Sequence, residues 1–154
     1  MLDWIASLPP ALYLQRSPNA YVLVNAAHIA ALGVLIGTIF ALDVRLLGAS
    51  RTLPVAAIAP YLSRIARYGL LGAMATGLWL FSVRPHEYAG NVAFLIKVGL
   101  VALGLLNAVW LHRRAAWHLA MEAGIISTAT RVHAAASLIM WFGAVLAGRW
   151  IGFL

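Results

Sequence analysis

Four stretches of this sequence are long and apolar enough to cross a lipid bilayer, and this pattern limits the possible folds more than any other feature. They cover about residues 21–42, 67–83, 92–111 and 132–154. A helix needs about 20 apolar residues to span the hydrocarbon core, where every backbone polar group must be bonded within the segment. The sequence therefore predicts an all-α fold: a single transmembrane domain over residues 1–154, built as a four-helix bundle.

The overall composition agrees with a membrane protein and excludes several functional classes. Hydrophobic residues make up 64% of the chain and charged residues only 10%, whereas soluble domains carry far more charge. Cysteine is absent, which excludes disulfides, thiolate metal sites and cysteine catalysis. The formal net charge is +7, but the basic residues are spread between the apolar stretches. We therefore interpret them as determinants of membrane topology and expect no nucleic-acid partner.

The distribution of arginine predicts the orientation of the bundle. The connections between the first and second and between the third and fourth stretches lie on one side and carry seven arginines. These are Arg45, Arg51, Arg64, Arg67, Arg113, Arg114 and Arg131. The opposite side carries three, namely Arg16, Arg84 and Arg149. By the positive-inside rule both termini then lie outside the cytoplasm, in a multi-pass protein of the bacterial inner membrane.

Three segments lie outside the four stretches. The N-terminal one does not resemble a cleaved signal peptide, because it contains Asp3 and a Pro9–Pro10 break and lacks a basic start. We expect it to lie in the membrane interface as a short segment interrupted by the two prolines. Residues 41–68 and 112–131 combine arginines with apolar residues, and we expect both to lie along the membrane surface.

Small residues three or four positions apart predict where the helices pack closely. Because lipid provides no hydrophobic driving force between helices, such residues allow two backbones to approach each other. They are Gly33 and Gly37 in the first stretch, Gly69, Ala73 and Thr76 in the second, and Ala144 and Gly148 in the fourth. We therefore predict a tight bundle in which one side of the first helix packs through its two glycines. An exposed face of this kind would suit a homo-oligomer equally well.

His28 is the strongest candidate for a functional residue within a span. It shares one face of the first helix with Asn25, away from Gly33 and Gly37, and lies about 10 Å below the outer surface. Ionisable groups at such a depth are costly and by default mark functional sites. His28 is therefore predicted to be an axial haem ligand, another metal ligand or a proton carrier. The alternative is a packing histidine hydrogen-bonded to an amide or a carbonyl.

Further polar residues lie at two levels of the predicted bundle. Lys97 in the third stretch and Arg149 in the fourth share the outer level with His28, where they could pair with haem propionates or supply a second ligand. Alternatively, both are anchors whose charged ends reach the interface. At the inner level His112 and His133 could pair as ligands, although histidine costs little so close to an interface.

A resemblance to an uncharacterised family of bacterial four-helix inner-membrane proteins is carried by four segments: NAAHIAALGVLIGTIFALDVRLLG, TGLWLF, NVAFLIKVGLVALGLLNAVWLH and SLIMWFGAVLAGRWIGF. More distantly, the first-helix histidine together with FLIK and LNAVWLH is similar to copper-resistance D proteins and to haem-binding bacterial protoporphyrinogen oxidases. In those oxidases a first-helix histidine and a third-helix lysine are the key positions, which fall on His28 and Lys97. This resemblance implies binding of haem b.

The leading hypothesis is a small b-type-cytochrome-like protein of the inner membrane that binds haem b and takes part in electron transfer. The candidate cofactor-binding residues are His28 as the ligand of the haem iron, with Asn25, Lys97, Arg149, His112 and His133. Its expected partners are the lipid bilayer and a quinone or another redox partner. The alternative is a non-enzymatic transport or accessory protein, for copper handling or as a subunit of a larger membrane complex.

Overall fold

The computed structural model describes residues 2–49 and 52–153, and these residues form helices without a strand, so the predicted all-α class is confirmed. Arg51, one of the seven arginines above, and Leu154, the end of the fourth stretch, lie outside the described residues. The described residues form four long helices, four short ones and a final 3-10 turn. Their bounds are α1 Leu2–Ala6, α2 Pro9–Arg16, α3 Pro18–Leu47, α4 Val55–Val83, α5 Pro85–Gly90, α6 Val92–His112, α7 Ala115–Glu122, α8 Thr128–Trp150 and η1 Ile151–Phe153.

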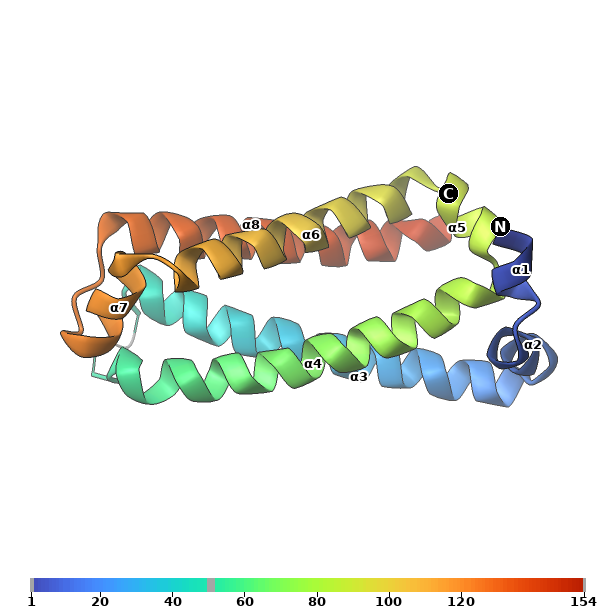
Figure 1. Cartoon of the computed structure of the whole chain (residues 1–154), viewed down its shortest axis with the longest axis horizontal. Helices are drawn as coiled ribbons and strands as arrows, with labels where there is room; N and C mark the ends of the chain where they lie inside the picture. The colour runs from blue at the N-terminus through green and yellow to red at the C-terminus, as the bar shows by residue number, and fades with distance from the viewer. Residues whose placement is uncertain (1, 50–51, 154) are drawn as a thin grey trace.

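The four long helices lie along a common axis as two antiparallel pairs (Figure 1). α3 packs mainly against α4, and α6 packs mainly against α8, while α3 and α8 join the two pairs. The short helices α1, α2 and α5 gather at one end of the bundle, close to the end of α8 (Figure 1). We call this the terminal end; α7 lies at the other, the α7 end.

Three segments are long and apolar enough to cross a membrane: α3, α6 and Thr128–Phe153, which joins α8 and η1. α4 is 29 residues long but is not among them, so the count of four spans is not established by length and apolarity. Large apolar side chains such as Leu23, Ile139 and Leu146 are exposed on the outside of the bundle. Such a surface is unfavourable in water and suited to lipid. These features indicate a membrane protein.

Side-chain caps fix the starts of three long helices. Ser17, Asn91 and Ser127 each accept a hydrogen bond from the backbone N–H three residues later, at the first turns of α3, α6 and α8. Each bond satisfies a donor that the helix itself leaves unpaired. α3 is followed by Gly48 with a φ of 118°, a left-handed conformation that glycine adopts without strain. Local sequence signals therefore set these boundaries.

Two of the long helices continue into residues 41–68, which the sequence analysis placed along the membrane surface. α3 extends to Leu47, and α4 already begins at Val55. Pro60 lies inside α4, which would ordinarily break a helix. It is tolerated because it lies in the second turn, where the ring and the missing N–H disturb only the start of the helix. Arg45, Arg64 and Arg67 are therefore carried on helix extensions.

The close packing predicted at Gly33 and Gly37 is wrong. A Cβ atom built on either glycine meets nothing within 4 Å, and both residues are exposed. The close approach of α3 and α4 lies at Gly69, where a Cβ atom would be 2.8 Å from the Leu35 backbone nitrogen. Since Gly33 and Gly37 are each two residues from Leu35, they lie on the opposite side of α3. The predicted small residue one turn after Gly69, Ala73, is indeed buried.

The continuous apolar core lies at the α7 end. Its buried members come from α3, α4, α6, α7 and α8, so all four long helices meet there. They are Leu42, Leu46, Val55, Ala59, Leu111, Trp117 and Ala134. The bundle is thus closed by apolar packing at this end, whereas the terminal end contains a pocket.

The helices α1 and α2, called the terminal helices below, fold back onto the terminal end. Trp79 Nε1 of α4 donates to the Pro10 carbonyl at 2.8 Å, and Gln15 Nε2 donates to the Val83 carbonyl at 3.2 Å. Leu14 is 2% exposed, so α2 also buries an apolar side chain there. Two consecutive prolines begin α2, where a missing N–H removes no helical bond. The N-terminal segment is therefore hydrogen-bonded to the bundle.

Candidate functional site

The side chain of His28 is held by a hydrogen bond between α3 and α4. Its Nδ1 lies 2.9 Å from Thr76 Oγ1, and Thr76 Oγ1 in turn donates to the Gly72 carbonyl at 2.6 Å. Because a hydroxyl has a single proton, Thr76 accepts from His28 in this arrangement. The proton of the neutral ring is therefore on Nδ1, which leaves Nε2 with a free lone pair.

Gly77 provides the space for this ring. A Cβ atom at this position would lie 3.0 Å from His28 Cε1, which is closer than ordinary carbon contacts. The imidazole therefore lies against the backbone of α4, one residue after the threonine that orients it. Thr76 thus accepts a hydrogen bond from the His28 ring, and the adjacent Gly77 leaves room for the ring against α4.

Lys97 reaches the same level from the other helix pair. Its side chain extends along α8, where a Cβ atom on Gly148 would lie 3.4 to 3.6 Å from Lys97 Cδ, Cε and Nζ. The Lys97 ammonium lies within electrostatic range of the His28 ring. Of the predicted site residues, His28 and Lys97 are therefore at a similar level of the bundle, on different helix pairs.

Asn25 and Arg149 occupy different surroundings. Asn25 is exposed on α3, one turn nearer the terminal end than His28. Arg149 is also exposed, and its guanidinium lies over the Phe153 ring at 4.9 Å from the ring centroid. Similar depth along a helix does not place side chains on the same side of it. The outer cluster accordingly consists of His28, Thr76 and Lys97.

The histidines near the α7 end have separate partners. His133 Nδ1 donates to Asn107 Oδ1 at 2.6 Å, and Asn107 Nδ2 donates to the His133 carbonyl at 3.0 Å. His112 Nδ1 lies 2.7 Å from the Ala108 carbonyl, and its ring centroid is 4.3 Å from that of Trp117. The two hydrogen bonds between His133 and Asn107 join α6 to α8, and the ring contact between His112 and Trp117 joins α6 to α7. Both histidines thus have structural contacts of their own.

Asp43 and Arg45, near the C-terminal end of α3, are both buried. They are 6% and 8% exposed, and Arg45 Nε donates to the Leu53 carbonyl at 2.7 Å. Ser137 of α8 lies beside the Asp43 carboxyl, and Asp43 Oδ2 is buried without a hydrogen-bond partner among the described residues. Ser137 was missed because a serine within an apolar helix shows no sign of which neighbour it faces.

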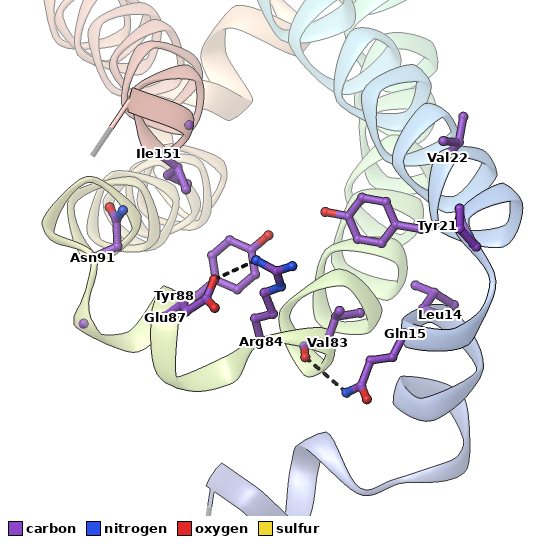
Figure 2. Close-up of a pocket in the computed structure, with 13 residues that line it drawn as sticks. Leu14, Gln15, Tyr21, Val22, Val83, Arg84, Glu87, Tyr88, Asn91 and Ile151 are labelled. Atoms are coloured by element: carbon purple, nitrogen blue, oxygen red, sulfur yellow. Dashed lines mark hydrogen bonds and ion pairs between the residues drawn. The ribbon is translucent and has the colours of Figure 1, made fainter.

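A pocket of about 1090 Å³ opens at the terminal end (Figure 2). Its walls come from α2, the start of α3, the end of α4, α5, the start of α6 and η1. The residues that line it are Leu14, Gln15, Pro18, Tyr21, Val22, Val83, Arg84, Glu87, Tyr88, Gly90, Asn91, Ile151 and Gly152. None of the predicted site residues is among them. The sequence analysis missed this pocket because its walls are assembled from six separate parts of the chain.

The polar groups of the pocket are mostly paired with one another. Arg84 and Glu87 form an ion pair of 3.3 Å, and Tyr21 and Tyr88 are neighbours within the pocket. Figure 2 shows both tyrosines directed into the space between the helix pairs. Burial, together with the hydrogen bond to Tyr21, raises the pKa of Tyr88 to about 12. Tyr88 is therefore neutral at physiological pH and remains a hydrogen-bond donor.

An exposed contact joins α1 to α5. His86 Nε2 lies 2.8 Å from Asp3 Oδ1, and both side chains are largely exposed to solvent. The hydrogen bond from His86 lowers the pKa of the Asp3 carboxyl below its ordinary value. His86 is thus engaged at the surface and is directed away from His28.

The pocket lies nearer to the terminal end of the bundle than the His28 cluster does. Tyr21 precedes His28 by seven residues on α3, and Asn91 precedes Lys97 by six at the start of α6. At 1.5 Å per residue both separations are about 10 Å along the axis. The pocket and the cluster are therefore separated by about two helical turns.

The donor set limits the metals that the described residues could hold. They contain no group of three or more His, Asp or Glu side chains arranged to bind a metal ion. A metal bound through protein ligands alone usually needs three or four of them. A single histidine with a free Nε2 instead suits a metal whose remaining ligands come from an organic cofactor.

Residues 19–154 match a protein family described as a family of unknown function (DUF6644). The predicted membership of an uncharacterised family is thereby confirmed. No curated protein and no solved structure matches the chain. The more distant similarity to copper-resistance D proteins and haem-binding oxidases accordingly gains no support from these comparisons.

Proposed function

Because the chain belongs to this family of unknown function, its activity is inferred from its own residues, and we propose that it binds haem b and transfers electrons within the membrane. The observation that carries this proposal is the free Nε2 lone pair of His28 inside a membrane-spanning helix. Histidines bind metals through one neutral ring nitrogen, while the other N–H is commonly held by an acceptor. Thr76 is that acceptor here.

The charge beside His28 also suits haem. Haem carries propionate groups, and Lys97 provides a cation within electrostatic range of His28. A bound haem would supply one-electron redox chemistry. The chain itself would contribute the axial nitrogen of His28, the Thr76 hydroxyl that orients it, and the Lys97 ammonium. With His86, His112 and His133 engaged elsewhere and His118 on α7 at the α7 end, the iron would have His28 as its one histidine ligand.

In this proposal α4 is the fourth membrane span. Since α4 packs along α3 with backbone contact at Gly69, it occupies the same depth as a helix that can itself cross the bilayer. The arginine distribution then directs the α7 end toward the cytoplasm and the terminal end outward, in an inner membrane. Alkaline phosphatase fused to the C-terminus should be active, and an inactive fusion would reverse this orientation.

The rival function is copper handling or an accessory role in a larger complex. The lack of a three-ligand group among the described residues gives copper no evident site there. Haem needs only one protein ligand, so the His28 cluster favours haem over copper. Metal analysis of the purified protein distinguishes the two, because the rival predicts copper and no haem iron.

An optical spectrum of the purified protein tests the haem proposal directly. The wild-type protein, produced in cells with ample haem, should show b-type Soret and α bands after reduction. His28→Ala should lose them, whereas His112→Ala should retain them, because His112 is exposed and bonded to its own helix. A wild-type protein without these bands, or unchanged bands in His28→Ala, would exclude His28 as a haem ligand.

A further inference from the structure

We infer that the pocket at the terminal end is a binding site for a neutral, membrane-soluble molecule whose head carries carbonyl oxygens. This inference goes beyond haem binding and does not depend on it, because it rests on the walls of the pocket. The pocket volume of about 1090 Å³ lies near the upper limit of small-molecule sites. It can therefore accept a head group together with the first part of an apolar tail.

The charge of the walls favours an uncharged ligand. Arg84 and Glu87 are the ionisable side chains of opposite sign among the lining residues, and they form an ion pair of 3.3 Å at the solvent-exposed rim of the pocket. An anion such as phosphate would have to compete with Glu87 for Arg84, and a cation would have to compete with Arg84 for Glu87. Neither charge therefore finds an uncompensated partner there.

Neutral donors are available at the same place. Burial raises the pKa of Tyr88 to about 12, so its hydroxyl stays protonated, and the hydroxyl of Tyr21 points into the same space (Figure 2). Asn91 uses Oδ1 to cap α6, which leaves its amide nitrogen to donate to a ligand. These neutral donors suit an oxygen acceptor on the ligand. Carbonyl oxygens meet this requirement without adding charge.

Apolar and aromatic side chains form the rest of the pocket. The ring of Tyr88 lies 5.5 Å from Phe94 and 6.2 Å from Phe81, and these two phenylalanines stack at 5.5 Å. This cluster fixes the position of Tyr88, while apolar side chains cover the remaining walls. The latter are Leu14, Val22, Val83 and Ile151. A ligand with a polar head and an apolar tail would satisfy both kinds of wall.

Two classes of membrane molecule have this chemistry: quinones, with ring carbonyls, and neutral ester lipids such as diacylglycerol. A quinone in this pocket would lie about 10 Å from the level of His28 along the helix axis. Binding can be measured on the purified full-length chain in detergent with two probes, a decyl-substituted benzoquinone and dioctanoylglycerol. Quenching of tryptophan fluorescence reports the quinone, and displacement of the quinone reports the ester lipid.

The decisive variant is Tyr21→Phe, which removes one of the two tyrosine hydroxyls that line the pocket and keeps the ring. We expect saturable binding by the wild-type protein and affinity that is weaker by about two- to tenfold in Tyr21→Phe. Tyr88→Phe tests the same hydroxyl pair from α5 and should weaken binding as well. Tyr68→Phe is the matched control, because Tyr68 is exposed on α4 outside the pocket, and it should bind like wild type.

The outcomes separate the two ligand classes and the two proposals. Quinone binding that the ester lipid does not displace assigns the site to quinones, and displacement assigns it to ester lipids. Absence of saturable binding by either probe, unchanged binding in both Tyr21→Phe and Tyr88→Phe, or displacement by inorganic phosphate overturns the inference. His28→Ala should bind the probes normally, so a failure of the haem proposal leaves this result intact.

Discussion

Replacing Gly69 with alanine should destabilise the protein by forcing α3 and α4 apart. The added Cβ atom would lie 2.8 Å from Leu35 N, 3.0 Å from Leu35 Cα and 3.1 Å from the Ala31 carbonyl oxygen. Carbon contacts are favourable at about 3.5–4.0 Å, so the helices would have to separate by about 0.5–1 Å. All three obstacles belong to backbone, which cannot turn aside as a side chain would.

The expected loss for such overpacking is about 1–3 kcal/mol of unfolding free energy. Since about 1.4 kcal/mol corresponds to a tenfold change in an equilibrium constant, unfolding should become about five- to 140-fold more favourable. Denaturant titration in mixed micelles, followed by tryptophan fluorescence, measures this change. Gly33→Ala and Gly37→Ala are matched controls, because nothing lies within 4 Å of a Cβ atom at either position. Gly69→Ala that is as stable as both controls would refute the proposed packing.

Three further predictions address the polar contacts. Thr76→Val removes the acceptor for the N–H of His28, so it should lower the free energy of unfolding by about 1–3 kcal/mol and reduce the haem content. Thr76→Ser keeps the hydroxyl and should retain haem. Asn107→Ala removes both hydrogen bonds between Asn107 and His133, so it should lower the free energy of unfolding by about 1–3 kcal/mol in the same denaturant titration. An unchanged unfolding midpoint would contradict a stabilising role for these bonds. The folded-state pKa of Asp3 is lowered, so its contact with α5 should persist above the ordinary value of 3.8 and be lost as the pH falls below it. Protection of α1 from hydrogen exchange, relative to the intrinsic rate at each pH, should then be lost in the wild type below pH 3.8. In Asp3→Asn this protection should be low both above and below pH 3.8.

The sequence was sufficient to predict the helices but not which of their faces meet. The four apolar stretches each overlap one of the long helices, although α4 begins at Val55, well before its predicted start at about residue 67. The prediction at Gly33 and Gly37 failed because two small residues define a smooth face without showing what covers it. Gly69 carries the real contact, and its partner is the backbone at Leu35, which a sequence pattern cannot single out.

The site could be predicted only in part for a similar reason. His28 and Lys97 stood out because charged or ionisable groups are costly within a span, so each is recognisable without its neighbour. Thr76 was noticed only as a small residue, although its hydroxyl sets the tautomer of His28. Arg149 was placed beside His28 by depth, but its direction around α8 takes it to Phe153 instead.

The contacts of the terminal helices have a consequence for the order in which the protein is assembled. Gln15 bonds to a carbonyl 68 residues later, Trp79 to one 69 residues earlier, and His86 to an aspartate 83 residues earlier. On the ribosome, the first helices are synthesised long before any of these partners exists. They must therefore wait beside the translocation machinery until α4 and α5 have been made. The wall that α2 gives to the pocket is thus completed late in biogenesis, after the helix pair beneath it has formed.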